Sequence, residues 1–251
     1  MLSYEKSIPL SGQTLVVGFD LEWTKNYKIK NGNKPFCFSF VFFSGDVALS
    51  TVEKQLHFGF YLRYAEREED IEDLIREANR ILGYFLDYSG AITIVGHQLS
   101  SDISVILNYP SGKQKSNFIR LKTLWQERKQ VPSKKRNLEV FDSRYDLKVL
   151  LKKKSRRLVD VCEECRLEVV QPEISSSMTK MQNDFYASGE KNIMEKLSIL
   201  NIRHSLSAAI LFLIHRDKRK ASMAINVNWI LRRNLADQFD YVSGKEFEKF
   251  L

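Results

Sequence analysis

Hydrophobic runs and polar intervals alternate along the chain in a way that predicts strands interleaved with helices. Three apolar segments near the N-terminus, rich in aromatic and β-branched residues, predict three consecutive strands at residues 14–20, 35–43 and 56–62. Apolar runs at residues 91–95 and 138–142 predict two further strands. Because helical segments separate these runs, the pattern indicates an α/β fold with a mixed sheet rather than a sandwich of two sheets.

Apolar residues recur at helical spacing in several of the intervals. The clearest helix is predicted at residues 66–87, followed by one that begins near Ser100 and one at residues 118–128. A long, strongly apolar helix is predicted at residues 193–214, and an amphipathic helix within residues 221–240. The apolar face of the first helix carries Ile71, Leu74, Ile75, Ala78, Ile81, Leu82 and Phe85.

The order of these elements suggests one large domain. We expect an α/β domain at residues 1–216 and a helical C-terminal extension at residues 217–251. The polar and basic segment at residues 110–137 reads as an insertion into the domain. A chain of 251 residues is long enough to bury a sizeable core in this way.

The overall charge favours a polyanionic partner. Lysine and arginine number 39 against 31 acidic residues, which gives a formal net charge of +8. The densest basic runs lie at residues 134–136, 152–157 and 218–220, and in a nucleic-acid-binding protein some of these would contact phosphates. No run of about 18 uncharged apolar residues predicts a membrane-spanning helix, and no apolar signal core follows Met1. We therefore expect an intracellular protein that is not secreted.

Several chemistries are disfavoured by the motifs that are missing. Three cysteines do not form a disulfide framework, and the pair Cys162 and Cys165 lacks two further ligands at zinc-site spacing. The pair is expected to be two thiols packed in the core. The sequence has no glycine-rich phosphate loop for ATP and no serine-hydrolase signature.

A pair of carboxylates ends the first predicted strand. Asp20 and Glu22 are two residues apart, so on a strand their side chains project to the same side. Two anions held together are costly unless a cation lies between them, and oxygen ligands favour Mg²⁺ or Mn²⁺. An exposed strand end carrying two acids by chance is the competing interpretation.

A further acid, Asp102, follows the predicted strand at residues 91–95 and lies in the first turn of the next helix. By itself it is explained by the helix dipole, which stabilises a negative charge at that end. Asp102 is a candidate site residue because of its place in the order of strands and helices.

Taken together, Phe-Asp-Leu-Glu-Trp at residues 19–23 and Gly-His-Gln-Leu-Ser-Ser-Asp at residues 96–102 resemble the DEDD family of 3′–5′ exonucleases. The resemblance spans roughly residues 14–214 and implies a ribonuclease H-like (DnaQ-like exonuclease) mixed sheet flanked by helices. It implies that Asp20, Glu22 and Asp102 hold two Mg²⁺ or Mn²⁺ ions for phosphodiester hydrolysis. In the histidine branch of the family, His204 on the late helix would be the general base. The substrate would be the 3′ end of single-stranded DNA or RNA.

The family's fourth carboxylate is absent at its expected place. In the histidine branch an aspartate follows the histidine after four residues, and here that position is Ala209. The chain is then an inactivated variant, a natural pseudo-nuclease, or a nuclease whose ligand comes from elsewhere, such as Glu195 or Asp217. The tyrosine branch offers Tyr186 followed by Glu190 in place of the histidine motif.

Three functions therefore remain open. The first is a metal-dependent 3′–5′ exonuclease, present natively or in disabled form. The second is a catalytically inactive module of the same fold that binds nucleic acid without cleaving it. The third is a transposase-like ribonuclease H domain using Asp20, Asp102 and a distant glutamate, against which the adjacent Glu22 argues.

Overall fold

A computed structural model describes most of the chain. The described residues are 1–8, 14–26, 28, 32–111, 115–130, 137–147, 151, 155–171, 173, 176–217 and 224–251. The basic runs at 134–136, 152–154 and 218–220 lie outside them, as do parts of the predicted insertion and the start of the predicted C-terminal helix.

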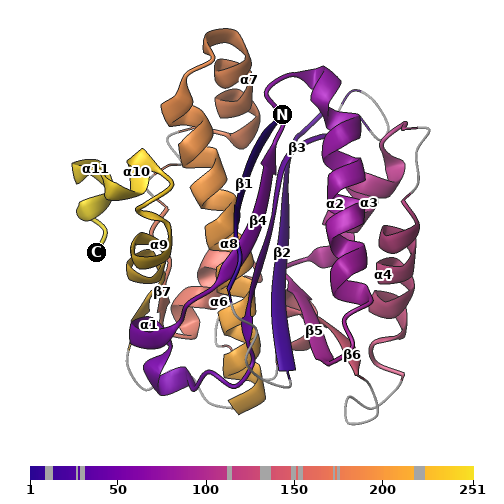
Figure 1. The fold of residues 1–251 in the computed structure, drawn as a ribbon, viewed down its shortest axis with the longest axis vertical. Helices are drawn as coiled ribbons and strands as arrows, with labels where there is room; N and C mark the ends of the chain where they lie inside the picture. The colour runs from indigo at the N-terminus through magenta and orange to yellow at the C-terminus, as the bar shows by residue number, and fades with distance from the viewer. Residues whose placement is uncertain are drawn as a thin grey trace.

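A six-stranded mixed sheet forms the centre of the protein (Figure 1). Its strand order is β1-β4-β3-β2-β5-β6, in which β5 and β6 run parallel to β2 and the other neighbouring strands are antiparallel. The five predicted strands are present, and β1 is an addition at the edge that was not predicted. The strands are β1 (Leu2–Lys6), β2 (Thr14–Thr24), β3 (Lys34–Ser44), β4 (Gly59–Tyr64), β5 (Ala91–Gly96) and β6 (Leu138–Asp142).

Helices cover both faces of this sheet (Figure 1). On one face lie α2 (Ile71–Leu86), α3 (Leu99–Asn108) and α4 (Ser116–Glu127), close to the predicted positions. The long helix α8 (Lys191–Asp217) crosses the other face, and α6 (Leu158–Glu164) and α7 (Met178–Ser188) pack against it. The predicted α/β class with a mixed sheet flanked by helices is confirmed. Short elements in the connections are the 3₁₀ turns Leu49–Thr51 and Glu68–Asp70, α1 (Val52–Gln55) and α5 (Ser143–Asp146).

The C-terminal part is helical, as predicted, and it packs against the sheet edge. It contains α9 (Val227–Leu235), α10 (Asp240–Ser243) and α11 (Lys245–Glu248), and β8 (Ile225–Asn226) pairs with β7 (Leu167–Glu168) in a second small sheet. The Tyr4 and Phe239 rings lie 4.8 Å apart, and Lys6 Nζ donates to the Asn234 carbonyl at 2.9 Å. The hydrophobic core consequently runs without a break from β2 to α11.

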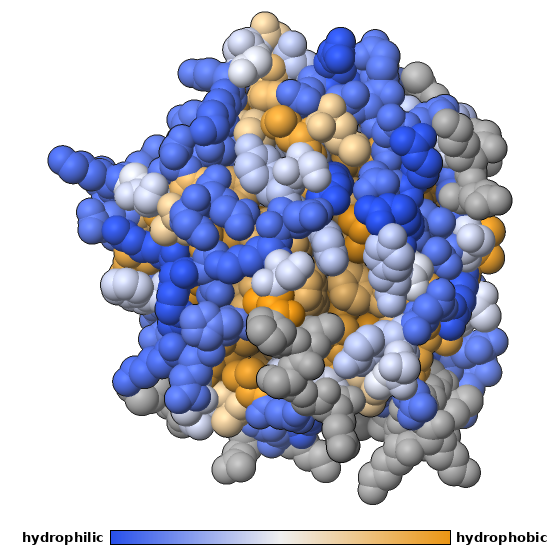
Figure 2. Space-filling view, in the orientation of Figure 1, coloured by the Kyte–Doolittle hydropathy of each residue, from blue (hydrophilic) through white to orange (hydrophobic). Residues whose placement is uncertain are grey.

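Helix α8 is apolar because it is enclosed by the rest of the protein. It has the length and hydropathy of a membrane-crossing helix, yet 94% of its most apolar window is buried inside the structure. By contrast, hydrophilic residues dominate the molecular face in Figure 2, and hydrophobic ones show mainly in its central hollows. Core packing is therefore sufficient to explain the composition of α8.

The backbone of α8 comes unusually close to the backbone of β2. A Cβ atom placed on Gly18 would lie 2.1 Å from the Ser205 carbonyl oxygen, so only glycine fits there. Beside this contact, the Ser205 and Ser39 hydroxyls lie 2.7 Å apart in a buried hydrogen bond between α8 and β3. These contacts fix the depth and the rotation of α8 over the end of β2, where the candidate site lies.

We predict that Gly18→Ala lowers the free energy of unfolding by more than about 3 kcal/mol, because two packed elements must separate to admit the methyl group. Chemical denaturation measures the change. Gly189→Ala is the control: its φ of 68° strains alanine, but no atom lies within 4 Å of the new Cβ, so the loss is about 1 kcal/mol. Equal losses in the two variants would show that the close approach has no special cost.

Candidate metal centre

Strand β2 presents two acidic side chains toward α8. Asp20 and Glu22 lie on the same side of the strand, as their spacing predicts, and both are largely buried, with side-chain exposures of 14% and 12%. The register between β2 and β3 shifts between Glu22 and Trp23. Such an irregularity bends the strand locally, next to the second carboxylate, and pairing resumes at Trp23 and Thr24.

Helix α8 supplies the side chains that meet these carboxylates. His204 Nδ1 lies 3.0 Å from Glu22 Oε1 and 3.5 Å from Asp20 Oδ2. One turn earlier, Asn201 Nδ2 donates to Asp20 Oδ2 at 2.7 Å. The candidate ligand atoms of Asp20, Glu22 and His204 all lie within 4.8 Å of one another. Three of the four predicted site residues are therefore brought into one cluster.

The fourth predicted residue, Asp102, lies in the first turn of α3 and is only 3% exposed. Burial and the charges of Asp20, Glu22 and Asp142 raise its pKa well above the ordinary value of an aspartate, so its carboxyl lies within electrostatic reach of the cluster. Within the described residues, Asp102 Oδ2 and Asn201 Oδ1 are buried oxygens that have no hydrogen-bond partner. Two unpartnered acceptors beside two carboxylates leave the region short of positive charge.

The protein meets part of this shortage with a histidine. Burial opposes the charged form of His204, but hydrogen bonds to Asp20 and Glu22 outweigh it and raise its pKa to about 10. Burial also raises the pKa of Glu22, with the Asp20 charge adding to it and the His204 hydrogen bond opposing it. At neutral pH the imidazolium of His204 therefore serves as the counter-charge for the acidic pair.

A buried carboxylate holds the start of α3 in place. Asp142, at the end of β6, accepts from the backbone N–H groups of Gln98, Leu99 and Arg144 at 2.9–3.1 Å. Its Oδ2 also accepts from Trp125 Nε1 at 3.0 Å. Gln98 has the left-handed φ of 61°, which is uncommon for any residue other than glycine. The two hydrogen bonds from Gln98 and Leu99 compensate for this backbone conformation and so orient the turn that carries Asp102.

The outer side of His204 is also fixed. The Gln171 side-chain amide lies 2.8 Å from His204 Nε2. The atom that faces the ring is the amide nitrogen Nε2, which donates to a neutral imidazole; with the imidazolium, the amide group must be turned so that its oxygen accepts. Next to it, the fully buried Arg203 makes two hydrogen bonds to Glu173, at 2.5 and 2.6 Å, and one to Asn228 at 2.9 Å. The segment that carries Gln171 is thereby anchored to α8.

Ala209 lies on the same helix as His204 and packs against β2 at Gly18. Its Cβ is fully buried and would be 3.3 Å from a Cβ on Gly18, in the core. Because α8 is continuous from Lys191 to Asp217, five residues turn the helix by about 140°. His204 and Ala209 therefore project from different sides of α8, and position 209 as the family's fourth carboxylate stays a prediction.

The alternative ligands considered from the sequence lie elsewhere. Glu195 Oε2 accepts from the Tyr241 backbone N–H at 2.8 Å, and its Oε1 lies 3.2 Å from Lys191 Nζ. Asp217 is the last residue of α8. Tyr186 lies on α7, where burial raises the pKa of its hydroxyl to about 12. None of these described side chains joins the cluster.

The two cysteines of the Cys-x-x-Cys spacing behave as predicted. Cys162 and Cys165 are both fully buried and neither forms a disulfide, so they are packed thiols.

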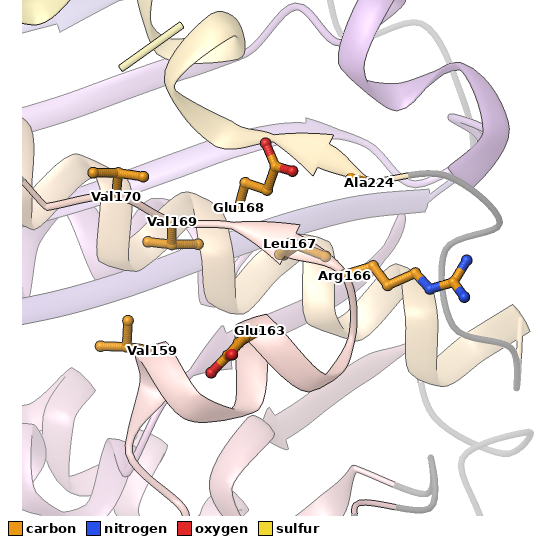
Figure 3. A pocket seen from close by; sticks show the side chains of 8 residues that line it. All are labelled: Val159, Glu163, Arg166, Leu167, Glu168, Val169, Val170 and Ala224. Atoms are coloured by element: carbon orange, nitrogen blue, oxygen red, sulfur yellow. The ribbon is translucent and has the colours of Figure 1, made fainter. Parts of the chain in front are cut away.

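A pocket of about 610 Å³ lies beside β7 and β8, apart from the acidic cluster (Figure 3). Val159, Leu167 and Val169 line it together with the acidic Glu163 and Glu168. None of the cluster residues lines this pocket. Arg166 lines it as well, so the lining mixes apolar, acidic and basic side chains, and among the described residues the groups that could hold a metal ion lie in the cluster instead.

Comparison with known proteins does not assign the chain to a family. Neither the models of known protein families nor the curated proteins contain a match to this chain.

Sequence reasoning missed Asn201, Gln171 and Asp142 as parts of the site. Asn201 had a usable signal, because it precedes His204 by three residues on the same face of a predicted helix. Gln171 and Asp142 come from a loop and from the end of a different strand, and only the assembled fold brings them to the site.

We predict that Ala209→Asp destabilises the protein and does not improve any metal-dependent activity. Its carboxylate would be enclosed in the core without a partner, which costs about 3 kcal/mol or more. Chemical denaturation and a cleavage assay measure the two effects. Ala209→Asn is the control for side-chain volume and loses less stability. A stable aspartate variant with faster cleavage would restore position 209 as the missing ligand.

Proposed function

We propose that the chain is a metal-dependent 3′–5′ exonuclease of the DEDD type that hydrolyses phosphodiester bonds of DNA or RNA. The observation that carries the proposal is the cluster itself: the candidate ligand atoms of Asp20, Glu22 and His204 lie within 4.8 Å of one another. Asp102, with an unpartnered buried oxygen, lies in electrostatic reach of it. These residues are the ones that the resemblance selects.

The order of the strands supports a ribonuclease H-like fold. From β4 to β6 the order is β4-β3-β2-β5-β6, with three antiparallel strands followed by two that are parallel to β2. The acidic pair lies on the central strand β2, and Asp102 follows the parallel strand β5. This is the arrangement in which the resemblance expects the motifs, with β1 as an extra edge strand.

The residues of the cluster fit a divalent cation. Asp20, Glu22 and Asp102 supply hard oxygen donors, and two buried oxygens near them have no hydrogen to accept among the described residues. These three carboxylates would hold Mg²⁺ or Mn²⁺, and His204 Nδ1 occupies the place of a further ligand. When bound, such ions stabilise negative charge on a phosphate and make water a better nucleophile.

The side chains of the protein have distinct tasks in this proposal. Asn201 holds one oxygen of Asp20 and leaves the other free to bind. His204 in its neutral form would hold an ion through Nδ1, and Gln171 holds the ring by its far side. His204 thus acts as a ligand in place of the absent carboxylate, in preference to the general-base role that the histidine branch implies.

We predict that the protein shortens 5′-labelled single-stranded DNA or RNA from the 3′ end when Mg²⁺ or Mn²⁺ is present, and that a chelator stops it. Asp20→Asn and Asp102→Asn each remove a ligand charge and lower the rate by about 100-fold or more. Asp73→Asn is the control, since Asp73 is half exposed on α2. Cleavage that survives Asp20→Asn would come from another site or a contaminant.

The nitrogen ligand leads to a prediction about metal preference. Imidazole suits transition-metal ions better than Mg²⁺, so cleavage should be faster with Mn²⁺ than with Mg²⁺. His204→Asp replaces the nitrogen with oxygen at the same place, and it should raise the Mg²⁺-dependent rate by about tenfold or more. Rates measured with both ions test this. An inactive aspartate variant that is folded would instead assign His204 an essential chemical role.

The second candidate is a binding module of the same fold that does not cleave. It is favoured by the hydrogen bond between His204 and Glu22, because an imidazolium can neutralise the acidic pair without any ion. In that case the protein binds single strands in the presence of a chelator, and neither the wild type nor His204→Asp cleaves them.

A further inference from the structure

A short segment after β6 carries an arginine and an exposed tyrosine. Tyr145, in α5, is 49% exposed. Its ring meets the Trp125 ring at a centroid distance of 6.2 Å and an interplanar angle of 75°. Trp125 is in turn held by its hydrogen bond to Asp142 and by the Arg128 guanidinium, 4.2 Å from its ring centre. Tyr145 is therefore an exposed aromatic ring on a rigid support.

Arg144 places a positive charge beside this ring. Its guanidinium carbon lies 5.9 Å from the centre of the Tyr145 ring, and Nη1 donates to the Arg156 carbonyl at 3.3 Å. In the described part of the chain, no carboxylate lies within ion-pair distance of the Arg144 or Arg156 side chain. The neighbouring Arg128, by contrast, is paired with Asp146 at 2.7 Å. Among the described residues, therefore, no carboxylate neutralises the charge of Arg144.

The sheet register brings this pair close to the metal centre. Gly18 of β2 pairs with Val95 of β5, and Gly96 of β5 pairs with Asp142 of β6. Asp20 lies two residues after Gly18, and Arg144 lies two residues after Asp142. Only β5 separates their strands, which corresponds to about 10 Å between the two backbones. A nucleic acid held at one position would therefore reach the other.

His97 joins the two regions. Its Nδ1 lies 2.9 Å from the Ser143 hydroxyl, and its Nε2 lies 2.9 Å from the Arg156 carbonyl that also accepts from Arg144. Burial, with the Arg144 charge adding to it, lowers the pKa of His97 to about 4, so the ring is neutral. A neutral ring with both nitrogens engaged is held in a fixed position beside Arg144 and Arg156.

We propose that Arg144 and Tyr145, with the exposed Arg156 beside them, form a nucleotide-binding subsite for single-stranded DNA or RNA next to the metal centre. This subsite would bind the substrate of the proposed function, and the proposal rests on that function. The guanidinium group of Arg144 binds a phosphate by charge-assisted hydrogen bonds, and the Tyr145 ring stacks on a base. Stacking accepts any base, so the subsite gives affinity without sequence preference.

The test measures binding separately from cleavage. Fluorescently labelled oligo(dT) and oligo(rU) are titrated with the protein in a chelator, which prevents metal-dependent hydrolysis. Tyr145→Ala should weaken binding about tenfold, while Tyr145→Phe keeps the ring and stays within about twofold of the wild type. Arg144→Gln should weaken binding by a similar factor and make the dependence on salt shallower by about one phosphate contact.

A second arginine–tyrosine pair provides a matched control. Tyr84 on α2 is 60% exposed, and the Arg80 guanidinium lies 5.1 Å from its ring centre, but Arg80 is paired with Glu77. Tyr84→Ala should leave binding unchanged.

The outcomes separate this subsite from the nuclease proposal. Wild-type affinity in Tyr145→Ala and Arg144→Gln, or no binding by the wild type itself, would overturn the subsite. Loss of binding in both variants without any cleavage by the wild type in Mg²⁺ or Mn²⁺ would uphold the subsite and refute the nuclease. The tighter of the two oligonucleotides identifies the nucleic acid, since only RNA offers a 2′-hydroxyl.

Discussion

The contact between α8 and β2 at Gly18 is the constraint on which the site depends. With a hydrogen atom in place of a side chain, the strand lets the Ser205 backbone approach closely, and this depth puts His204 and Asn201 against Asp20. The same packing buries the acidic pair, which makes a positive charge necessary. His204, whose pKa is raised to about 10 by its hydrogen bonds to Asp20 and Glu22, supplies that charge at neutral pH. An ion that enters must therefore compete with the proton on this histidine.

The sequence pattern predicted the parts of the fold that repeat a strong period. Strands β2 to β6 and helices α2, α3, α4 and α8 were found because each has a long apolar run or a regular apolar face. Strand β1 was missed because it is an edge strand, with Leu2 and Tyr4 alternating with the polar Ser3 and Glu5, and it lacks an apolar run. The two-residue strands β7 and β8 are too short to leave any pattern.

Only the parts of the site that follow from the spacing of the motifs could be predicted. Asp20, Glu22 and His204 meet as expected, since a strand brings alternate residues to one side and the late helix crosses that strand. The place of the fourth carboxylate at position 209 stays a prediction, because five residues of a continuous helix turn His204 and Ala209 to different sides of α8. The hydrogen bonds of Asp142 to the turn before α3 depend on chain segments more than 40 residues apart, and such contacts are set by tertiary packing alone.

The most direct test of the metal centre is anomalous X-ray diffraction from crystals of the wild-type protein grown with Mn²⁺. The account predicts an anomalous peak at the carboxylates of Asp20 and Glu22, with His204 Nδ1 turned toward the ion. A saturating concentration of Mn²⁺ that leaves no peak there, with His204 still hydrogen-bonded to Glu22, would contradict it.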